Sequence, residues 1–323
     1  MRDHGGNLDA AMAAFGGASE DWVDLSTGIN PGPYPLPEIP ARAWEVLPTA
    51  ADLKALEQAA QRAYRTDAKV LPLAGASAAI QLVPQLRKPG QARVLGPTYN
   101  EHAAALSAAG WQVDTVADIA GLLGADLAVV VNPNNPDGRR SEPEALMSLA
   151  ASVDFLVVDE SFADGWPELS LVPHLDASTE GIMVLRSFGK FFGLAGLRLG
   201  FAIGGKEIGR MGELAGPWPV SGPAIAVGAK ALNDAVWKEA SFARLSEDAR
   251  RLDTLANVAG WNVVGGTELF RLYDAGNAQL AQNMLAKGKV WSRIFPYSKG
   301  WIRLGLPDGE KDWAQVETAF ATF

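Results

Sequence analysis

Apolar and polar positions change rhythm repeatedly over the first two thirds of the chain. Short runs that are apolar at almost every position, such as 127–132 (LAVVVN) and 155–160 (FLVVDE), are typical of strands buried on both faces. Other stretches, such as 52–64 (DLKALEQAAQRAY), repeat apolar residues every three to four positions, which indicates amphipathic helices. This alternation predicts an α/β fold with a mostly parallel central sheet and helices on both faces. The expected strands are 69–75, 92–96, 111–116, 127–132, 155–160, 182–187 and 198–204.

Two clusters of Pro and Gly interrupt this rhythm. The first, 26–40 (STGINPGPYPLPEIP), indicates an irregular, extended arm over the first 40 residues, and the second is 216–223 (GPWPVSGP). The elements expected after the second cluster are a long Ala-rich helix at 230–260 and strands at 261–266, 290–295 and 301–307. The expected divisions are an N-terminal arm and small-domain segment at 1–39, a large domain at 40–215 and a smaller C-terminal α/β domain at 216–323.

Composition narrows the class of partner. The 323 residues carry a formal net charge of −9, which argues against nucleic acid or an anionic membrane surface. There are no cysteines, so disulfides, thiolate metal ligands and cysteine nucleophiles are excluded. With only three histidines, we expect no metal site. No apolar run reaches the roughly 18 residues of a membrane span, and no long apolar signal core is found, so we expect a cytoplasmic protein.

Four segments place unusual residues at the ends of expected strands, where ligands bind in such folds. Residues 73–80 (LAGASAAI) join a strand to a helix, and backbone N–H groups there can hold a phosphate, although a plain turn has the same pattern. Residues 129–138 (VVVNPNNPDG) end a strand with three amides. These amides fit either a turn that stops the strand or a side chain aimed at a ligand oxygen.

The other two segments carry charges. Asp159, in FLVVDESFAD, follows an apolar run, so its buried carboxylate requires a partner in an ion pair, a helix cap or a protonated heterocycle nitrogen. Lys190 lies in RSFGKFFGLAGLRLG. A lysine in an apolar pocket loses its proton readily and becomes a nucleophile, although most lysines reach from a loop to water. Ser187 and Arg198 could hold an anion beside it.

Together these segments offer a phosphate cradle, an amide, a buried carboxylate and a reactive lysine, in that order. Pyridoxal 5′-phosphate requires such a lysine and a carboxylate at its pyridine nitrogen. SFGKFFGLAGLRLG resembles the Ser-x-x-Lys…Gly-Leu-Arg-x-Gly signature of the class I/II aminotransferases, NPNNPDG resembles their Asn-Pro-x-Gly turn, and VVDESF resembles their aspartate strand. The resemblance spans about residues 24–305. It implies the fold-type I pyridoxal phosphate transferase fold, pyridoxal 5′-phosphate as cofactor, and a homodimer with the active site at its interface.

The resemblance also implies individual roles. As the expected catalytic residues, Lys190 would bind the cofactor as a Schiff base, Asp159 would keep its pyridine nitrogen protonated, and Tyr99 would stack on its ring. Arg303 would grip the substrate carboxylate, with Arg293 assisting it or binding a substrate phosphate. By themselves, Tyr99 also fits a half-buried aromatic and Arg303 a surface charge. The expected cofactor-binding residues are Gly75, Ala76, Ser77, Tyr99, Asn135, Asp159, Phe162, Ser187, Lys190 and Arg198. The expected substrate-binding residues are His4, Gly28, Asn30, Asn135, Arg293 and Arg303.

Within the family, two stretches resemble the threonine-phosphate decarboxylases of cobalamin biosynthesis. These are HGGN at 4–7 and DLSTGINP at 24–31. Those enzymes typically carry a Phe three residues after the aspartate, as Phe162 does here, where aminotransferases have a Tyr that bonds the cofactor's phenolic oxygen. The resemblance implies decarboxylation of L-threonine O-3-phosphate to (R)-1-amino-2-propanol phosphate. An aminotransferase for a phosphorylated substrate such as histidinol phosphate, and a non-catalytic protein of the same fold, stay open.

Three positions depart from the family pattern. Asp137 stands where the turn usually has Thr, and Gly189 stands before the lysine where a hydroxyl residue is common, which removes one possible phosphate ligand. Leu47-Pro48 occupies the place of a Tyr-Pro pair whose tyrosine reaches the neighbouring subunit's phosphate. We expect that contact to be absent or supplied elsewhere, for example by Tyr64.

Overall fold

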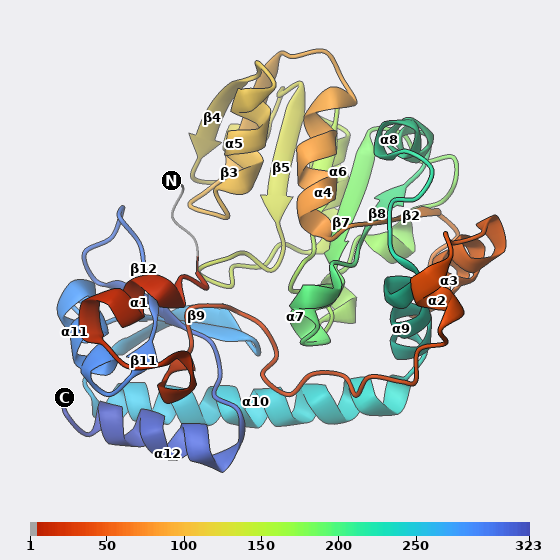
Figure 1. Ribbon diagram of the computed structural model, residues 1–323. Helices are drawn as coiled ribbons and strands as arrows, with labels where there is room; N and C mark the ends of the chain where they lie inside the picture. Colours follow the sequence, from red (N-terminus) through yellow and green to blue (C-terminus); the bar gives the residue numbers. More distant parts are fainter. Residues whose placement is uncertain (1–4) are drawn as a thin grey trace. The chain divides into compact units, whose positions relative to one another are not determined.

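The computed structural model describes residues 5–323, which form two compact units (Figure 1). The large unit consists of residues 34–135 and 139–237. The small unit consists of the chain up to residue 33, residues 136–138 and residues 238–323. The N-terminal segment therefore folds with the C-terminal part of the chain. The division into 1–39, 40–215 and 216–323 stays a prediction.

A seven-stranded sheet forms the centre of the large unit, in the order β2-β8-β7-β6-β5-β3-β4. β8 runs antiparallel to both of its neighbours, and the other neighbouring pairs are parallel. β5 and β6 are buried at every position, as their continuous apolar runs predict. The mostly parallel α/β sheet is thereby confirmed. The strands are β2 Lys69–Leu73, β3 Gln91–Leu95, β4 Gln112–Val116, β5 Leu127–Val131, β6 Leu156–Asp159, β7 Ile182–Ser187 and β8 Gly200–Gly204.

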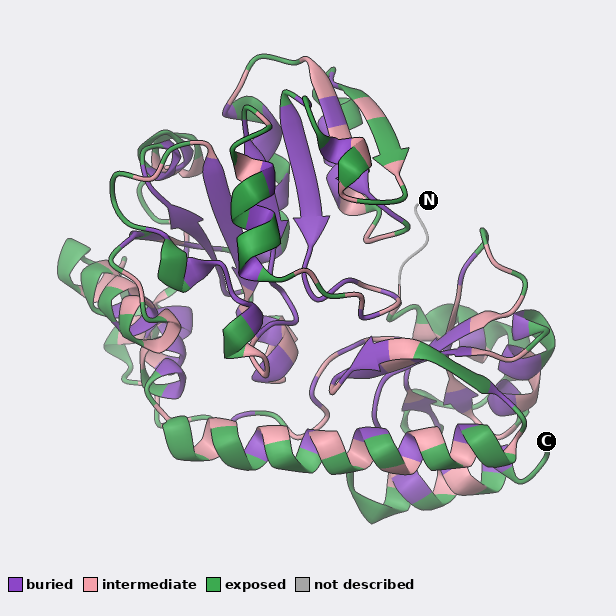
Figure 2. Cartoon of the chain, turned by 180° about the vertical axis from the view of Figure 1, so that it is seen from behind, coloured by how far each residue is buried: buried purple, intermediate pink, exposed green. Residues whose placement is uncertain are grey.

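Helices cover this sheet on both sides. Figures 1 and 2 view the unit from opposite directions, and each shows helices in front of the strands. Side chains of α4, α5 and the sheet form a continuous core that includes Leu73, Ile80, Leu106 and Trp111. The helices are α2 Arg42–Glu45, α3 Ala50–Tyr64, α4 Ala76–Leu82, α5 Glu101–Ala108, α6 Pro143–Ala150, α7 Phe188–Phe191, α8 Glu207–Ala215 and α9 Gly222–Leu232. The 3₁₀ turns are Val83–Gln85, Ala120–Leu122, Pro167–Leu169, Val172–His174 and Ala195–Leu197.

The small unit holds a four-stranded antiparallel sheet in the order β12-β13-β10-β9, and a separate parallel pair of β1 and β11. α10 begins in the large unit and continues into the small one. The strands are β1 Val23–Asp24, β9 Asn262–Thr267, β10 Phe270–Asp274, β11 Val290–Trp291, β12 Arg293–Ile294 and β13 Trp301–Leu304. The helices are α1 Leu8–Phe15, α10 Ala235–Val258, α11 Ala278–Lys287 and α12 Gly309–Phe320, with a 3₁₀ turn at Ser19–Asp21. No helix within residues 5–323 is long and apolar enough to cross a membrane.

Three expectations about single elements were wrong. The arm was expected to be irregular, but it forms α1, where the Asn7 side chain caps the helix by accepting from the N–H of Ala10. The helix expected at 230–260 breaks before α10, because the Asp234 carboxylate accepts from the N–H of Trp237 at 3.0 Å and starts a new helix. The strand expected at 290–295 divides at Ser292 into two strands of different sheets.

β8 and the start of α4 approach so closely that only glycine fits at position 200. A Cβ on Gly200 would lie 2.4 Å from the backbone nitrogen of Ala76 and 2.6 Å from the carbonyl carbon of Gly75. Both neighbouring atoms belong to the backbone, so neither can rotate away as a side chain would. Gly200 therefore allows the start of α4 to pack against the strand that follows Arg198.

We expect Gly200→Ala to lower the free energy of unfolding by about 1–3 kcal/mol, because the added methyl group must push two backbone segments apart. Gly209→Ala is the matched control, since Gly209 is exposed inside α8 and its Cβ would meet nothing within 4 Å. Alanine there should raise the free energy of unfolding by about 0.5–1 kcal/mol. Urea unfolding followed by circular dichroism measures both, and equal effects of the two substitutions contradict this packing.

Candidate active site

One pocket in the large unit brings together every residue expected to bind the cofactor. It is lined at the ends of β2, β5, β6 and β7, where the strands of an α/β sheet give way to loops. Tyr99, at the start of α5, also lines it. Segments that are distant in the sequence thus meet at one edge of the sheet, although their roles stay predictions. The expected residues that line the pocket are Gly75, Ala76, Ser77, Tyr99, Asn135, Asp159, Phe162, Ser187, Lys190 and Arg198.

A glycine and an arginine shape the part of the pocket where α4 begins. Gly75 has a φ of 82°, a left-handed conformation that glycine adopts without strain. A Cβ on Gly75 would lie 2.8 Å from Nη2 of Arg198, so the guanidinium lies directly against this glycine. Arg198 itself has a φ of 55°, and its Nη1 donates to the carbonyl of Ala195 at 3.2 Å. A cation beside backbone N–H groups at the start of a helix suits a phosphate.

Asp159 is the buried acid of the pocket, only 2% exposed at the end of β6. Nε2 of His102 lies 2.8 Å from its Oδ2, and the hydroxyl and the N–H of Ser161 donate to its Oδ1 at 2.5 and 2.9 Å. Burial alone raises the pKa of Asp159, but the contacts with His102 and Ser161 outweigh burial and hold that pKa below its ordinary value of 3.8. Asp159 is therefore held as a carboxylate.

His102 and Ser161 were missed by the sequence analysis. The need for a donor near Asp159 was clear, but nothing in a single sequence shows that α5 packs against the end of β6. One signal was present, because His102 follows Tyr99 by three positions, close to one helical turn. The two rings meet edge to face, with 6.3 Å between their centroids. His102 is thus placed by the same short segment that brings Tyr99 to the pocket.

Lys190 lies on α7, a helix of four residues. Its neighbours Phe188 and Phe191 are buried, whereas Lys190 is half-buried and lines the pocket. Its Nζ lies 5.7 Å from the centre of the Phe162 ring. The apolar residues around Lys190 in the sequence therefore pack into the protein and leave the lysine facing the pocket.

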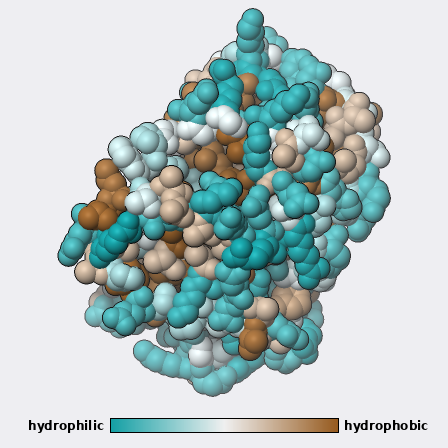
Figure 3. All heavy atoms as spheres, turned by 90° about the vertical axis from the view of Figure 1, so that its right-hand side faces the viewer, coloured by the Kyte–Doolittle hydropathy of each residue, from teal (hydrophilic) through white to brown (hydrophobic). Residues whose placement is uncertain are grey.

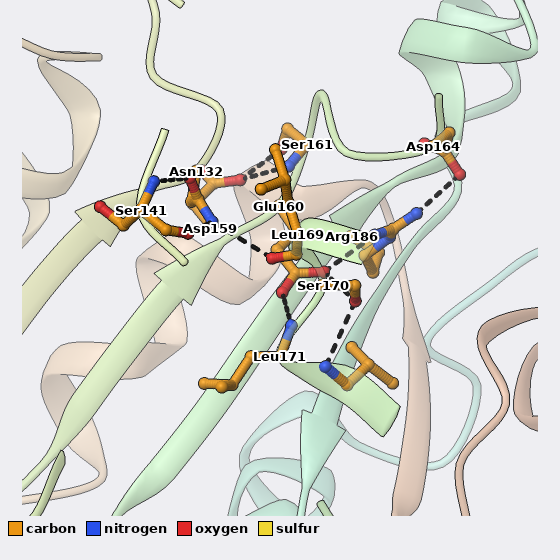
Figure 4. A network of polar contacts seen from close by, with 11 residues as sticks. Asn132, Ser141, Asp159, Glu160, Ser161, Asp164, Leu169, Ser170, Leu171 and Arg186 are labelled. Atoms are coloured by element: carbon orange, nitrogen blue, oxygen red, sulfur yellow. Dashed lines mark hydrogen bonds and ion pairs between the residues drawn. The ribbon is translucent and has the colours of Figure 1, made fainter. Parts of the chain in front are cut away.

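Of the three asparagines of NPNNP, two form hydrogen bonds that fix the loop and one lines the pocket. Asn132 closes the loop, because its side chain donates to the carbonyls of Ser141 and Leu169 and accepts from the N–H of Ser141 (Figure 4). Asn134 accepts from the hydroxyl of Thr98 and donates to the carbonyl of Pro97. Asn135 is the amide that lines the pocket. Both interpretations of this segment thus apply, each to different amides.

A buried ion pair lies next to Asp159 and Ser187 in the sequence. Nη1 of Arg186 donates to Glu160 at 2.9 Å and Nη2 donates to Asp164 at 2.8 Å (Figure 4). Glu160 also accepts from the hydroxyl of Ser170 at 2.6 Å. Burial raises the pKa of Glu160, and nearby carboxylates raise the pKa of Arg186 against burial, which lowers it. These contacts join β6, β7 and the loop that carries Phe162.

Arg293 and Arg303 lie in the small unit, directly opposite each other on β12 and β13. Arg303 is buried, and its Nη2 donates to the carbonyl of Ser26 at 2.7 Å. Burial and the positive charge of Arg293 lower the pKa of Arg303 to about 10. Tyr297 and Asp24 act on that pKa in the opposite direction, and the roles of the two arginines stay predictions.

The remaining expected substrate residues belong to the N-terminal segment. Gly28 and Asn30 are buried in the small unit. The side-chain oxygen of Asn30 accepts from Nη2 of Arg244 at 2.6 Å and from the N–H of Gly32 at 3.0 Å, so it fixes the path of this segment. His4 lies outside the described residues. Among residues 5–323, no group of three or more His, Asp and Glu side chains is placed to hold a metal ion.

Comparisons with known proteins show the family of the chain. The family model for aminotransferase class I and II matches residues 21–317. The chain belongs to the class I and II aminotransferase family. Similar proteins include a threonine-phosphate decarboxylase of Sinorhizobium, 44% identical over 96% of this chain and 95% of the relative. Another, from Pseudomonas aeruginosa, is 42% identical over 100% of this chain and 98% of the relative.

A solved structure of the same fold is the histidinol-phosphate aminotransferase from Sinorhizobium meliloti in complex with pyridoxal-5′-phosphate. It has a TM-score of 0.81 to this chain and 18% sequence identity, and it covers 97% of this chain and 94% of its own. This likeness confirms the expected fold-type I architecture, a seven-stranded mostly parallel sheet beside a smaller antiparallel one. The resemblance to the class I/II aminotransferases is likewise confirmed.

One departure from the family pattern, Gly189, has a structural explanation, whereas the contact expected in place of Leu47 stays a prediction. A Cβ on Gly189 would lie 2.8 Å from Cα of Ala195, so the hydroxyl residue common in the family does not fit here. Tyr64 does not line the pocket. The guanidinium carbon of Arg186 lies 4.5 Å from the centre of the Tyr64 ring, and this ring also meets the ring of Phe201 edge to face. Burial raises its pKa far above the ordinary value. Leu47 is 61% exposed.

We expect His102→Ala to raise the pKa of Asp159. Burial raises this pKa, and the substitution removes one of the two residues whose contacts lower it. A carboxylate whose folded-state pKa is lowered stabilises the fold at pH values above its unfolded pKa, and the stabilisation is lost as the pH falls through the folded value. The variant should therefore lose about 1–3 kcal/mol of unfolding free energy at neutral pH. The difference from the native protein should shrink as the pH falls below 3.8.

His174→Ala is the control for this substitution, because His174 is exposed on a 3₁₀ turn of the same unit. It should change the unfolding free energy by less than about 0.5 kcal/mol at any pH. Urea unfolding across the pH range measures both variants. A loss for His102→Ala that stays constant with pH would show that only a cavity was made.

Proposed function

We propose that the chain is a pyridoxal 5′-phosphate-dependent threonine-phosphate decarboxylase. It converts L-threonine O-3-phosphate to (R)-1-amino-2-propanol phosphate and CO₂, a step of cobalamin biosynthesis. The observation that carries the proposal is the single pocket that gathers Lys190, Asp159 and Arg198 with the other expected cofactor residues. Two relatives named for this activity match nearly the whole chain at 42–44% identity, which supports the choice of reaction.

The residues of the pocket fit the cofactor. Asp159 is a buried carboxylate held charged by His102 and Ser161, which suits a protonated pyridine nitrogen. The guanidinium of Arg198 against the backbone of Gly75 suits its phosphate. When bound, pyridoxal 5′-phosphate accepts the electron pair left when a bond to the substrate's α-carbon breaks.

The chain's own side chains then share the remaining work. Lys190 would supply the amine that holds the cofactor, and Tyr99 would supply a ring that packs on it. Asn135 would donate to the cofactor's phenolic oxygen. Phe162 offers only an apolar ring at 5.7 Å from Nζ of Lys190, with no hydroxyl for that oxygen. Once CO₂ has left, Nζ of Lys190 would give a proton to the α-carbon, where the electron pair of the broken C–C bond becomes a C–H bond.

Arg293 and Arg303 bind the acidic groups of the substrate. Burial and the charge of Arg293 lower the pKa of Arg303, and Tyr297 and Asp24 act in the opposite direction, as an anionic substrate group would. Arg303 holds the substrate carboxylate, and Arg293 assists or binds the substrate phosphate. The angle at which they hold the carboxylate decides whether CO₂ or the α-proton leaves, and transamination of a phosphorylated amino acid such as histidinol phosphate is therefore the alternative.

We also propose that the chain works as a homodimer. Several large apolar side chains of the large unit are exposed, four of them within residues 36–47 and one shortly before α9. Their exposed fractions lie between 50% and 67%. Figure 3 shows brown, hydrophobic atoms among the hydrophilic ones on the side that carries α2 and α3. Exposed apolar groups of this size are typical of interfaces. These residues, the apolar patch, are Leu36, Trp44, Val46, Leu47 and Trp218. The cytoplasmic location stays a prediction.

The reaction is tested with purified protein, pyridoxal 5′-phosphate and L-threonine O-3-phosphate. We expect CO₂ and aminopropanol phosphate in equal amounts, a yellow protein, and loss of both the colour and the activity in Lys190→Ala. Lys206→Ala is the control, because Lys206 is exposed and pairs with Glu180 away from the pocket. Release of a keto acid with conversion of the cofactor to its amine form would replace this proposal with the aminotransferase.

The dimer is tested by substitution in the apolar patch. We expect Trp44→Glu to weaken self-association by at least about tenfold, because a charge would be buried in the interface. Val258→Glu is the matched control, an apolar residue 85% exposed in the small unit. Sedimentation equilibrium over a range of concentrations measures both. A native protein that stays monomeric at every concentration contradicts the proposal.

A further inference from the structure

Five aromatic side chains pack together at the turn that carries Lys190. This aromatic cluster consists of Tyr34, Phe188, Phe191, Phe192 and Trp237. Phe188 and Phe192 stack with 4.2 Å between ring centroids and 7° between ring planes. Trp237 continues the stack on Phe192, at 5.5 Å and 10°. Three rings thus form one column that ends on the helix bearing the lysine.

The geometry of α7 links the position of the stacked rings to the direction of the Lys190 side chain. Phe188 and Phe192 are four positions apart, so their side chains share one face of the turn. Lys190 is two positions from each, which places its side chain about 200° around the axis. Holding the two phenyl rings on one side therefore directs Lys190 to the other side, where the pocket lies.

α7 is short, and the N–H of Phe188 joins its start to the carbonyl of Leu199 at 3.2 Å. It is four residues long and has no side-chain cap, and a helix this short is unstable by itself. Gly189 lies within it and Gly193, with a φ of 67°, follows it. Figure 1 shows α7 as a short coil beside the end of β7. The position of Lys190 therefore depends on packing of the three buried phenylalanines, which are at most 3% exposed.

Trp237 is itself held by two hydrogen-bonded neighbours. Oδ1 of Asp234 accepts from the N–H of Trp237 at 3.0 Å, and Oδ2 accepts from the hydroxyl of Tyr34 at 3.2 Å. The N–H of Tyr34 donates to the carbonyl of Phe192 at 2.8 Å. The ring of Tyr34 meets Trp237 edge to face, with 5.1 Å between centroids. Asp234 thus ties the start of α10 to the turn after Lys190.

We propose that Trp237 is a positioning residue for Lys190, acting through its stack on Phe192 and Phe188. Tyr34 and Asp234 hold Trp237 in register with that stack. Trp237 does not line the pocket, so it acts on the lysine without contacting the ligand. The inference rests on the proposed function, since it takes Lys190 as the residue that holds the cofactor.

The test compares Trp237→Leu, which removes the stacked ring, with Trp237→Phe, which keeps one. Trp111→Leu is the matched control, because Trp111 is 4% exposed in the core of the same unit and is absent from the cluster. The first readout is the pH dependence of the absorbance of the lysine-bound cofactor, which depends on the surroundings of Nζ. We expect its midpoint to shift in Trp237→Leu and to stay native in Trp237→Phe and Trp111→Leu.

The second readout separates kcat from KM. Trp237→Leu should lower kcat by about tenfold to a hundredfold, the effect of a displacement of about 1 Å at a reacting group. Its KM should stay within about threefold of the native value, because binding groups are untouched. Trp237→Phe should restore kcat, and Trp111→Leu should lower the melting temperature only. Tyr34→Phe, which loses the bond to Asp234, should show a smaller shift in the same direction.

Each result decides between the alternatives. If Trp237→Leu has the absorbance profile and kcat of Trp111→Leu, Trp237 has only a structural role. If Trp237→Phe is as impaired as Trp237→Leu, stacking is not the cause. If Trp237→Leu does not fold, Tyr34→Phe decides, and a native profile for it overturns the proposal. A native protein that never binds the cofactor through Lys190 instead overturns the proposed function.

Discussion

A carboxylate buried at the end of a strand is the constraint on which this site depends. Asp159 is 2% exposed, and a buried charge is tolerated only when donors or an opposite charge surround it. His102 and Ser161 meet that need from two directions and keep the carboxylate ionised. One side of the acid still faces the pocket. The contact between His102 and Asp159 joins α5, and with it Tyr99, to the end of β6.

Because side chains alternate along β6 and β7, some of their polar residues line the pocket and others form ion pairs in the interior. Successive residues of a strand point to opposite faces, so Asp159 and Ser187 line the pocket while their neighbours Glu160 and Arg186 turn away from it. Glu160 and Arg186 pair in the interior and gather the loop that carries Phe162 (Figure 4). At the end of each strand, therefore, one of two consecutive polar residues lines the pocket and the other forms an ion pair in the interior.

The central strands could be predicted from the sequence, and so could the residues that gather in the pocket. The features that were missed all depend on contacts that the sequence pattern does not show. The continuous apolar runs predicted the central strands, since such runs are stable only when buried on both faces. The break before α10 was missed because Asp234 reads as an ordinary helix residue until its bond to the N–H of Trp237 is seen. His102 was missed because its partner is distant in the sequence.

The sequence by itself determined the α/β class, the order of the motifs along the chain and the cofactor that these motifs indicate. These depend on local patterns, such as a glycine before a helix, an acid after an apolar run and a lysine among glycines. Only the tertiary structure decided which groups keep Asp159 charged, why Gly189 excludes a side chain, and what holds the turn of Lys190. Each of those depends on packing between segments far apart in the chain. A residue's type limits the partners it can take, but the fold alone decides which partner comes within reach.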